Sequence, residues 1–470
     1  MIRVAVMSAL ISALALSPPA SSAPGSARPP NIVFILADDL GFAELGCYGQ
    51  KLIKTPHIDR LAAEGIKFRQ AFAGSCVCAP SRSTLMTGLH TGHTPVRSNG
   101  GGKPLLDADI TVAAVLKQAG YVTGGFGKWG LGIENTSGHP NRQGFDEFFG
   151  YFHQVHAHFY YPYYLWSNDT KYNLPANEGK KREQYSADVI HAQGLEFLRR
   201  NRDRTFFCYL PYTLPHVELV VPEDSMTPYR SKFKEAPLPD PRPGYIGAEQ
   251  PYATFAGMVS RMDRYVGDVM ALLKELKIDD KTIVFFSSDN GPQGGPWKRV
   301  ADFFDGKDGL RGYKGDFYEG GIRVPLIVRW PGKIKPGSVS DHVCAFWDFM
   351  PTFAQIAQVE PPRNLDGISF LPALLGRRAQ QKHPFLYWEI REGGGLTQAV
   401  RMGDWKAVRP RHNMPLELYD LKTDPGESTN VAAKHPDVLK QITDYMATAR
   451  VEERAYPKEE PAPTVKDYVR

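Results

Sequence analysis

The sequence predicts an α/β protein in which helices sandwich a large, mostly parallel (mixed) sheet, followed by a smaller α+β domain with an antiparallel sheet. Two apolar runs, at residues 31–37 and 282–288, each lead into a pair of polar residues and indicate buried strands of one sheet. Helical patterns alternate with such strands over most of the chain, whereas short strands follow one another after about residue 380. We therefore expect a first domain at residues 28–378 and a second at 379–470.

The other elements follow from local patterns. Residues 57–65 predict a short helix that Gly65 closes, and residues 110–120 predict an amphipathic helix that ends at Gly120. Further helices are expected at 255–276 and 435–449. Further strands are expected at 66–72, 121–130 (where the strand runs into a Gly-rich loop), 205–210, 385–390, 397–410 and 416–424.

The composition indicates an exported globular protein. Of 470 residues, 42% are hydrophobic and 23% are charged, and the net charge of +5 is not gathered in runs, which argues against nucleic-acid binding. Arg3, a short apolar stretch and a segment rich in Ser, Ala and Pro predict a signal peptide at residues 1–23. We expect a periplasmic or extracellular protein (lysosomal or secretory in a eukaryotic host) without a membrane anchor.

The two strand ends predict a metal site. Asp38 and Asp39 end the first apolar run, and Asp289 and Asn290 end the second. If both strands end at one edge of the sheet, these oxygen ligands converge, and they suit Ca²⁺ or Mg²⁺ better than zinc. The alternative is that each Asp caps the next helix or turn.

The stretch CVCAPSRSTLMTG, residues 76–88, raises a second question. A zinc half-site would need another close cysteine pair, which the sequence lacks. Pro80 predicts a helix start, and a helix N-terminus lowers the pKa of a thiol and directs N–H groups at an anion. Arg82 returns one turn after Cys78, so we interpret Cys78 as an anion-facing nucleophile. The alternative is a small buried side chain beside a surface arginine.

These motifs resemble type I, formylglycine-dependent sulfatases of the alkaline phosphatase superfamily, in particular arylsulfatase A and N-acetylgalactosamine-6-sulfatase-like members. In that family the cysteine of C-x-P-S-R is oxidised to formylglycine, and here the match runs unbroken from Cys78 to Gly88. Similar segments span nearly the whole mature chain: NIVFILADDLG (31–41), GYVTGGFGKWGLG (120–132), SSDNG (287–291), GLRGYKGDFYEGGIRVPLIVRWPG (309–332) and LYDLKTDPGESTN (418–430).

The resemblance implies a role for each matching residue. One Ca²⁺ would be bound by the modified side chain at position 78 together with Asp38, Asp39, Asp289 and Asn290. Arg82 and Lys128 would steady the formylglycine hydrate, Lys314 would hold sulfate oxygens, and His216 would lie near the leaving-group oxygen. The hydrate would attack sulfur and then expel sulfate to restore the aldehyde. A formylglycine-generating enzyme would be the partner during maturation.

One position departs from the family pattern. The second signature reads G-K-W-H in the family, with a histidine expected to act on the hydrate, but here Gly130 stands in that place. The nearby segment 144–166 contains His153, His156 and His158. We favour His156 as the replacement, with His158 next. The alternative is that these histidines line the substrate pocket or lie at the surface.

The resulting functional prediction is an exported sulfuric ester hydrolase. Its substrates would be carbohydrate O-sulfates of a sulfated polysaccharide or glycosaminoglycan, or an aryl sulfate. One alternative is a phosphate or phosphonate monoester or diester hydrolase of the same superfamily. A remote alternative, suggested by Gly130, is an inactive glycan-binding relative.

Overall fold

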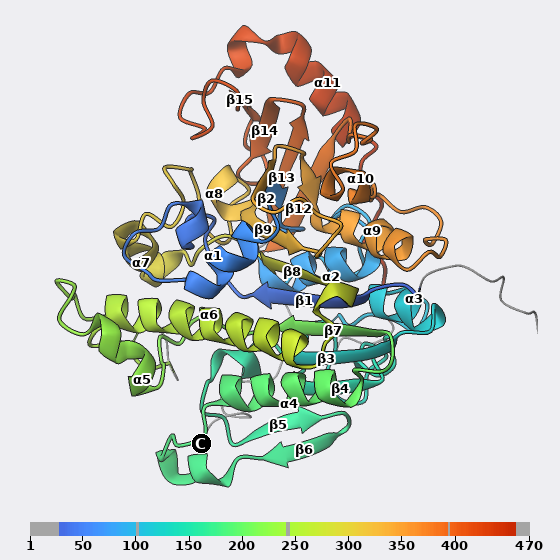
Figure 1. The fold of residues 1–470 in the computed structure, drawn as a ribbon. Coiled ribbons are helices and arrows are strands. Elements are labelled where there is room, and N and C mark those ends of the chain that lie inside the picture. Colours follow the sequence, from blue (N-terminus) through green and yellow to red (C-terminus); the bar gives the residue numbers. More distant parts are fainter. Residues whose placement is uncertain (1–27, 100–102, 241–244, 393–394, 457–470) are drawn as a thin grey trace, which may run out of the picture.

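The computed structural model describes residues 28–99, 103–240, 245–392 and 395–456, and its centre is a mixed sheet of eleven strands (Figure 1). The strand order is β10-β2-β9-β8-β1-β7-β3-β4-β5-β6, with β11 paired to β2. The strands are β1 (Asn31–Ala37), β2 (Ile66–Phe72), β3 (Val122–Lys128), β4 (Glu147–Tyr151), β5 (Tyr164–Ser167), β6 (Thr170–Asn173), β7 (Phe206–Pro211), β8 (Thr282–Ser288), β9 (Arg323–Arg329), β10 (Ser338–Ser340) and β11 (Cys344–Ala345).

The middle of this sheet is parallel, as the apolar runs predict. β1 pairs in parallel with both β7 and β8, and β3 pairs in parallel with β7 and β4. β9 lies antiparallel between β2 and β8, and β5 and β6 form an antiparallel margin, so the sheet is mixed. The carboxyl ends of β1, β7, β3 and β8 therefore meet at one edge.

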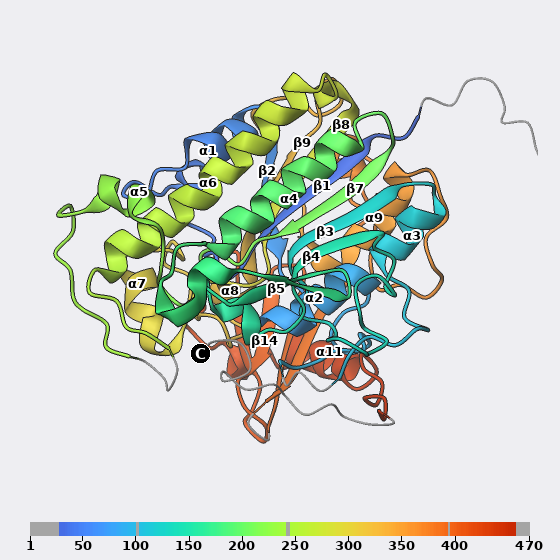
Figure 2. The same cartoon turned by 90° about the horizontal axis from the view of Figure 1, so that it is seen from below.

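Helices cover both faces of the large sheet, because its central strands carry apolar side chains on both faces, as β1 illustrates. Its residues are all buried, and they alternate between two hydrophobic cores: Val33 and Ile35 face one, whereas Ile32 and Phe34 face the other. The helices of the first face are α1 (Pro56–Ala63), α4 (Ser186–Arg200) and α6 (Pro251–Glu275), of which α4 and α6 lie side by side in Figure 2. Those of the second face are α2 (Cys78–Thr87), α3 (Val112–Gln118) and α9 (Phe349–Ile356). The remaining short helices are α5 (Glu223–Met226), α7 (Lys298–Phe303), α8 (Glu319–Ile322) and α10 (Leu371–Leu374).

The smaller antiparallel sheet predicted for the C-terminal region is present. It has four strands in sequence order, β12 (Leu386–Glu392), β13 (Gly395–Met402), β14 (Trp405–Arg409) and β15 (Glu417–Asp420). On one face α11 (Pro436–Met446) packs through Val438 and Ile442, and on the other Trp388 packs against Phe72 of the large sheet. The domain boundary at 378/379 stays a prediction.

The remaining expectations concern the N-terminal segment and the absence of a membrane anchor. The predicted signal peptide lies outside the described residues. No helix in the described ranges is long and apolar enough to cross a membrane. All five cysteines carry free thiols.

Candidate active site

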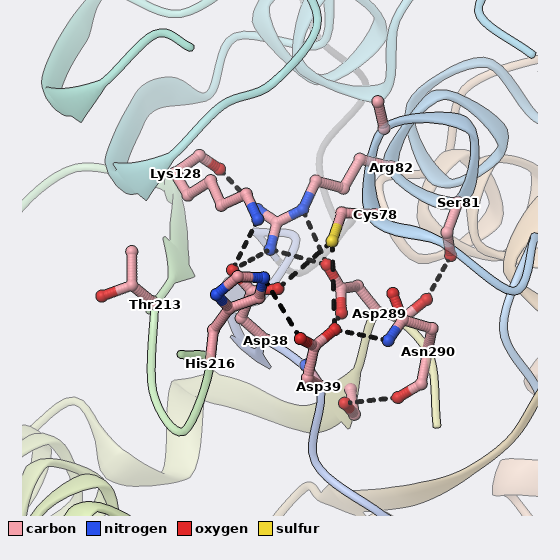
Figure 3. A network of polar contacts seen from close by, with 12 residues as sticks. Asp38, Asp39, Cys78, Ser81, Arg82, Lys128, Thr213, His216, Asp289 and Asn290 are labelled. Carbon is pink, nitrogen blue, oxygen red and sulfur yellow. Dashed lines mark hydrogen bonds and ion pairs between the residues drawn. The ribbon is translucent and has the colours of Figure 1, made fainter. Parts of the chain in front are cut away.

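The carboxyl ends of β1 and β8 bring the two predicted polar pairs together, because Ala37 and Ser288 are register partners. The backbone N–H of Asp39 donates to Asp289 Oδ1 at 3.2 Å. The Asn290 side-chain Nδ2 donates to Asp39 Oδ1 at 2.6 Å (Figure 3). Asp38, Asp39, Asp289 and Asn290 all have no solvent exposure. The expectation that both strands end at one edge is thus confirmed.

This group of residues fits a divalent cation. Asn290 Oδ1 is buried and has no hydrogen-bond partner among the described residues, although buried polar atoms are normally satisfied. Burial raises the pKa of Asp289 to about 7, and the neighbouring Asp38 charge adds to that rise. A cation bound among these oxygens would coordinate the unpartnered Asn290 Oδ1 and favour the ionised form of the carboxylates. Hard oxygen ligands of this kind suit Ca²⁺ or Mg²⁺.

Cys78 opens α2 and lies against the carboxylates. Its Sγ is 3.5 Å from Asp38 Oδ1 and 3.9 Å from Asp39 Oδ1. Every residue of α2 is buried, and the N–H of Ala79 already donates to Asn99 Oδ1 at 2.9 Å. The helix start at this cysteine therefore occurs inside the protein.

The expected lowering of the Cys78 pKa is wrong. Burial raises the pKa of this thiol well above its ordinary value and outweighs the opposing charges of Lys128 and Lys314. A helix N-terminus that is closed off from water cannot offset the cost of forming a buried thiolate. The unmodified Cys78 is therefore a neutral thiol and a poor nucleophile.

Three cations from distant parts of the chain face the carboxylates, two of them buried and the third, Lys314, partly buried. Arg82 donates from Nη2 to Asp289 Oδ2 at 2.9 Å, and Lys128, at the end of β3, donates to Asp38 Oδ2 at 2.7 Å. Lys314, in the loop before α8, donates to Asp39 Oδ2 at 2.8 Å. Such positive charges suit an anionic substrate group.

These charges also act on the carboxylates. Burial alone would raise the pKa of Asp38, but Lys128, His216 and Arg82 together hold it well below its ordinary range. Asp38 is thus an ionised carboxylate at neutral pH.

His216 joins this cluster, as predicted. Its Nε2 lies 3.2 Å from Asp39 Oδ2 and 3.0 Å from Lys314 Nζ. Its Nδ1 contacts the Val217 carbonyl, which can only accept, so Nδ1 carries the hydrogen. Nε2 is consequently the nitrogen that faces the charged residues.

His156, the favoured replacement for the missing signature histidine, packs against two tyrosines. Its ring contacts Tyr151 and Tyr164, each at 4.8 Å between ring centroids. His158 instead stacks on His216 at 4.3 Å, and its Nδ1 bonds with the Tyr245 hydroxyl. Of these two histidines, the structure brings His158 to the cluster.

The sequence interpretation also missed two polar residues at the site. Ser81 donates from Oγ to the Asp289 carbonyl at 2.5 Å, and Gln293 donates to Asp39 Oδ2. Ser81 lies within the quoted C-x-P-S-R motif, and Gln293 lies three residues after Asn290. Their closeness in the sequence to the predicted ligands is therefore the signal that could have identified both residues.

The fold and site define an α/β protein with a cluster of carboxylates and cations at the carboxyl ends of its central strands. A family model described as Sulfatase matches residues 30–359, and a second, described as N-sulphoglucosamine sulphohydrolase, C-terminal, matches residues 313–452. The chain therefore belongs to the sulfatase family, whose members are sulfuric ester hydrolases.

Three curated relatives match most of the chain. Canine N-acetylgalactosamine-6-sulfatase is 32% identical over 84% of this chain and 74% of its own length. Human arylsulfatase A is 32% identical, with 88% and 87% covered. The N-acetylgalactosamine-6-O-sulfatase of Bacteroides thetaiotaomicron is 28% identical, with 90% and 94% covered.

Solved structures agree with this fold. Ps i-CgsB in complex with k-i-k-neocarrahexaose superposes with a TM-score of 0.77 at 26% identity, covering 94% of this chain and 96% of that one. Phosphonate monoester hydrolase of Agrobacterium radiobacter reaches 0.67 at 22% identity, covering 89% and 95%, and this likeness concerns the fold alone.

Proposed function

We propose that this protein is an exported sulfatase that hydrolyses O-sulfate esters of a sulfated polysaccharide or glycosaminoglycan. The observation that carries the proposal is the position of Cys78 at the start of α2, against Asp38 and Asp39 and beside buried cations. The printed names of the relatives, two of them N-acetylgalactosamine-6-sulfatases, support a sulfated sugar as substrate.

A modified side chain at position 78 suits the site better than the thiol does. The buried thiol is neutral, whereas formylglycine would supply an oxygen nucleophile that can release sulfate without remaining esterified. Its formation requires a formylglycine-generating enzyme. The segment at residues 1–23 supports export of the mature chain.

Each surrounding group has a part in this proposal. Asp38, Asp39, Asp289 and Asn290 would hold one Ca²⁺ together with position 78, and the ion would supply electrostatic stabilisation of developing negative charge. Three cations would hold the anionic oxygens at the reaction centre: Arg82, Lys128 and Lys314. His216 would present Nε2 toward the leaving-group oxygen.

The test compares two neighbouring buried cysteines, Cys78 and Cys76. Peptide mass spectrometry should find the modification at position 78 and an ordinary thiol at position 76 in the active protein. Cys78→Ala should lose turnover of sulfated saccharides by about 10³-fold or more, because the reaction loses its nucleophile. Cys76→Ala should keep its turnover, since Cys76 packs in the hydrophobic cluster beneath the C-terminal sheet.

Parallel assays decide between the alternatives. Aryl sulfate and aryl phosphate are compared at matched concentrations, and preferential phosphate cleavage would establish the phosphate or phosphonate hydrolase instead. A fully modified protein that binds sulfated glycans without cleaving them would be the inactive relative. An unmodified Cys78 in active protein would contradict the formylglycine proposal.

A further inference from the structure

Gln154 is a buried glutamine whose side-chain amide has no protein partner in the described ranges. Its exposed fraction is 6%, and neither Oε1 nor Nε2 makes a hydrogen bond to a described residue. Buried polar groups of native proteins are normally hydrogen-bonded, because an unsatisfied one destabilises the fold. The Gln154 amide is therefore expected to bond to a group other than the described protein atoms.

The amide occupies the place that a side chain at position 130 would need. A Cβ atom added to Gly130 would lie 2.3 Å from Gln154 Nε2, which is closer than two such atoms can approach. Gly130 also has φ +81°, a left-handed conformation that favours glycine. The Gln154 side chain can therefore occupy this position only because residue 130 is a glycine.

The chain runs from the charged cluster directly to this pair of residues. Gly130 comes two residues after Lys128, whose Nζ binds Asp38 at 2.7 Å. The N–H of Gly130 donates to the Phe152 carbonyl at 2.9 Å, which ties the end of β3 to the segment that carries Gln154. The amide therefore lies in the turn that follows β4, beside the residues that continue β3 beyond Lys128.

We infer that Gln154 takes the place of the signature histidine that Gly130 lacks, with its side-chain N–H donating to an oxygen atom at the reaction centre. This inference rests on the proposed function, because the oxygen would belong to the sulfate group or to the modified residue 78. An amide donates and accepts hydrogen bonds but does not titrate near neutral pH. Gln154 would hold an oxygen atom in place, and any proton transfer would need another group.

The test replaces the amide and compares it with a matched glutamine. Gln154→Leu removes the donor at similar volume, and Gln154→Glu places a carboxylate against the anionic group. Gln143 is the control: it is 2% exposed, but its Nε2 donates to the Ser137 and Leu106 carbonyls at 2.8 and 3.2 Å. Three quantities are measured for each variant: the melting temperature, kcat on a sulfated saccharide, and the dissociation constant of inorganic sulfate.

Gln154→Leu should lower kcat by about 10²-fold, the usual effect of losing one donor to a developing anion, and weaken sulfate binding about tenfold. Its melting temperature should stay unchanged or rise, since no protein hydrogen bond is lost. Gln154→Glu should be less active than Gln154→Leu. Gln143→Leu should behave in the opposite way, with a lower melting temperature and an unchanged kcat for the folded enzyme.

Two outcomes would overturn the inference. One is a Gln154→Leu enzyme with wild-type kcat and wild-type sulfate affinity, which would mean that a buried water satisfies the amide. The other is a loss of activity that only follows a loss of folded protein. A wild-type enzyme without sulfatase activity would refute the proposed function separately, and the sulfate affinities of the variants would still test Gln154.

Discussion

At the residue scale, the site is a balance of buried charges. Among the described residues, the carboxylates of Asp38, Asp39 and Asp289 face the cations of Arg82, Lys128 and Lys314. A divalent cation added to this balanced set makes the site positive, which suits a substrate that carries a sulfate group. In the proposed function, the same residues would thus bind a metal ion and prepare the site for an anion.

Metal removal should destabilise the protein more at higher pH. Without the ion, burial and Asp38 raise the pKa of Asp289 from 3.8 to about 7, so between these values the folded state binds more protons than the unfolded state. Stability of the metal-free protein should fall as pH rises across that window. The gain in melting temperature from Ca²⁺ should therefore be larger at about pH 8 than at about pH 5. When the free Ca²⁺ concentration is a hundredfold above Kd, binding should raise the free energy of unfolding by about 2.7 kcal/mol.

Calorimetry with Ca²⁺ or with a chelator measures this difference. Asn290→Ala is the companion variant, because it removes the orphan Oδ1 that the cation would satisfy, and it should weaken the Ca²⁺ effect. A Ca²⁺ effect that is the same at all pH values and in Asn290→Ala would contradict the assignment of the ligands.

At the element scale, Ser81 holds α2 against the end of β8. Its Oγ donates to the Asp289 carbonyl and accepts from the N–H of Gly74 at 3.1 Å. The bond to Asp289 joins the element that begins with Cys78 to the strand end that carries two of the proposed metal ligands. If the proposed function holds, the relative position of the nucleophile and the metal ion would thus depend on one hydroxyl.

Ser81→Ala should cost about 1–3 kcal/mol of stability, because it leaves two buried backbone groups unsatisfied, and it should also lower kcat. The matched control is Thr111→Ala. Thr111 is the N-cap of α3, with Oγ1 accepting from the Ala114 N–H at 3.1 Å, and its loss should cost about 1 kcal/mol without a change in kcat. Denaturant unfolding measures the stability of both variants, and steady-state kinetics measures their kcat. Equal kinetics for both variants would refute the positioning role of Ser81.

At the scale of the whole molecule, the C-terminal sheet supports the loop that carries Lys314. Lys406 in β14 is fully buried between two carboxylates, at 2.9 Å from Glu319 and 3.0 Å from Glu427. Glu319 opens α8 five residues after Lys314, and the N–H of Gly315 donates to the Cys76 carbonyl at 2.8 Å. The C-terminal sheet thereby helps to hold a cation of the candidate active site.

Lys406→Met should destabilise the protein by about 3–5 kcal/mol, because it leaves the buried Glu427 carboxylate without its cation and Glu319 with Arg323 alone. It should also reduce activity in the fraction that stays folded, since α8 and the Lys314 loop lose their anchor. Lys440→Met is the control, as Lys440 forms a solvent-exposed pair with Asp444 at 2.7 Å and should change little. Chemical unfolding and activity of the purified variants give the comparison. Unchanged stability in Lys406→Met would show that the buried pair is dispensable.

Much of the fold and site could be predicted from local patterns. The run at 31–37 is the whole of β1, and the run at 282–288 is the whole of β8, because continuous apolar residues can only be buried on both faces of a central strand. Asp38, Asp39, Asp289 and Asn290 follow from those strand ends. The antiparallel course of β9 between β2 and β8 had no local signal, since strand direction depends on the connections between elements.

The sequence by itself determined which residue types meet at the strand ends and that Cys78 opens a helix. Tertiary structure alone decided that the Cys78 thiol is neutral, because burial depends on what packs over the helix start. It also decided that His158 rather than His156 stacks on His216, and that the space beside Gly130 belongs to Gln154. The two positions of that pair lie 24 residues apart, and only the parallel pairing of β3 with β4 brings them into contact.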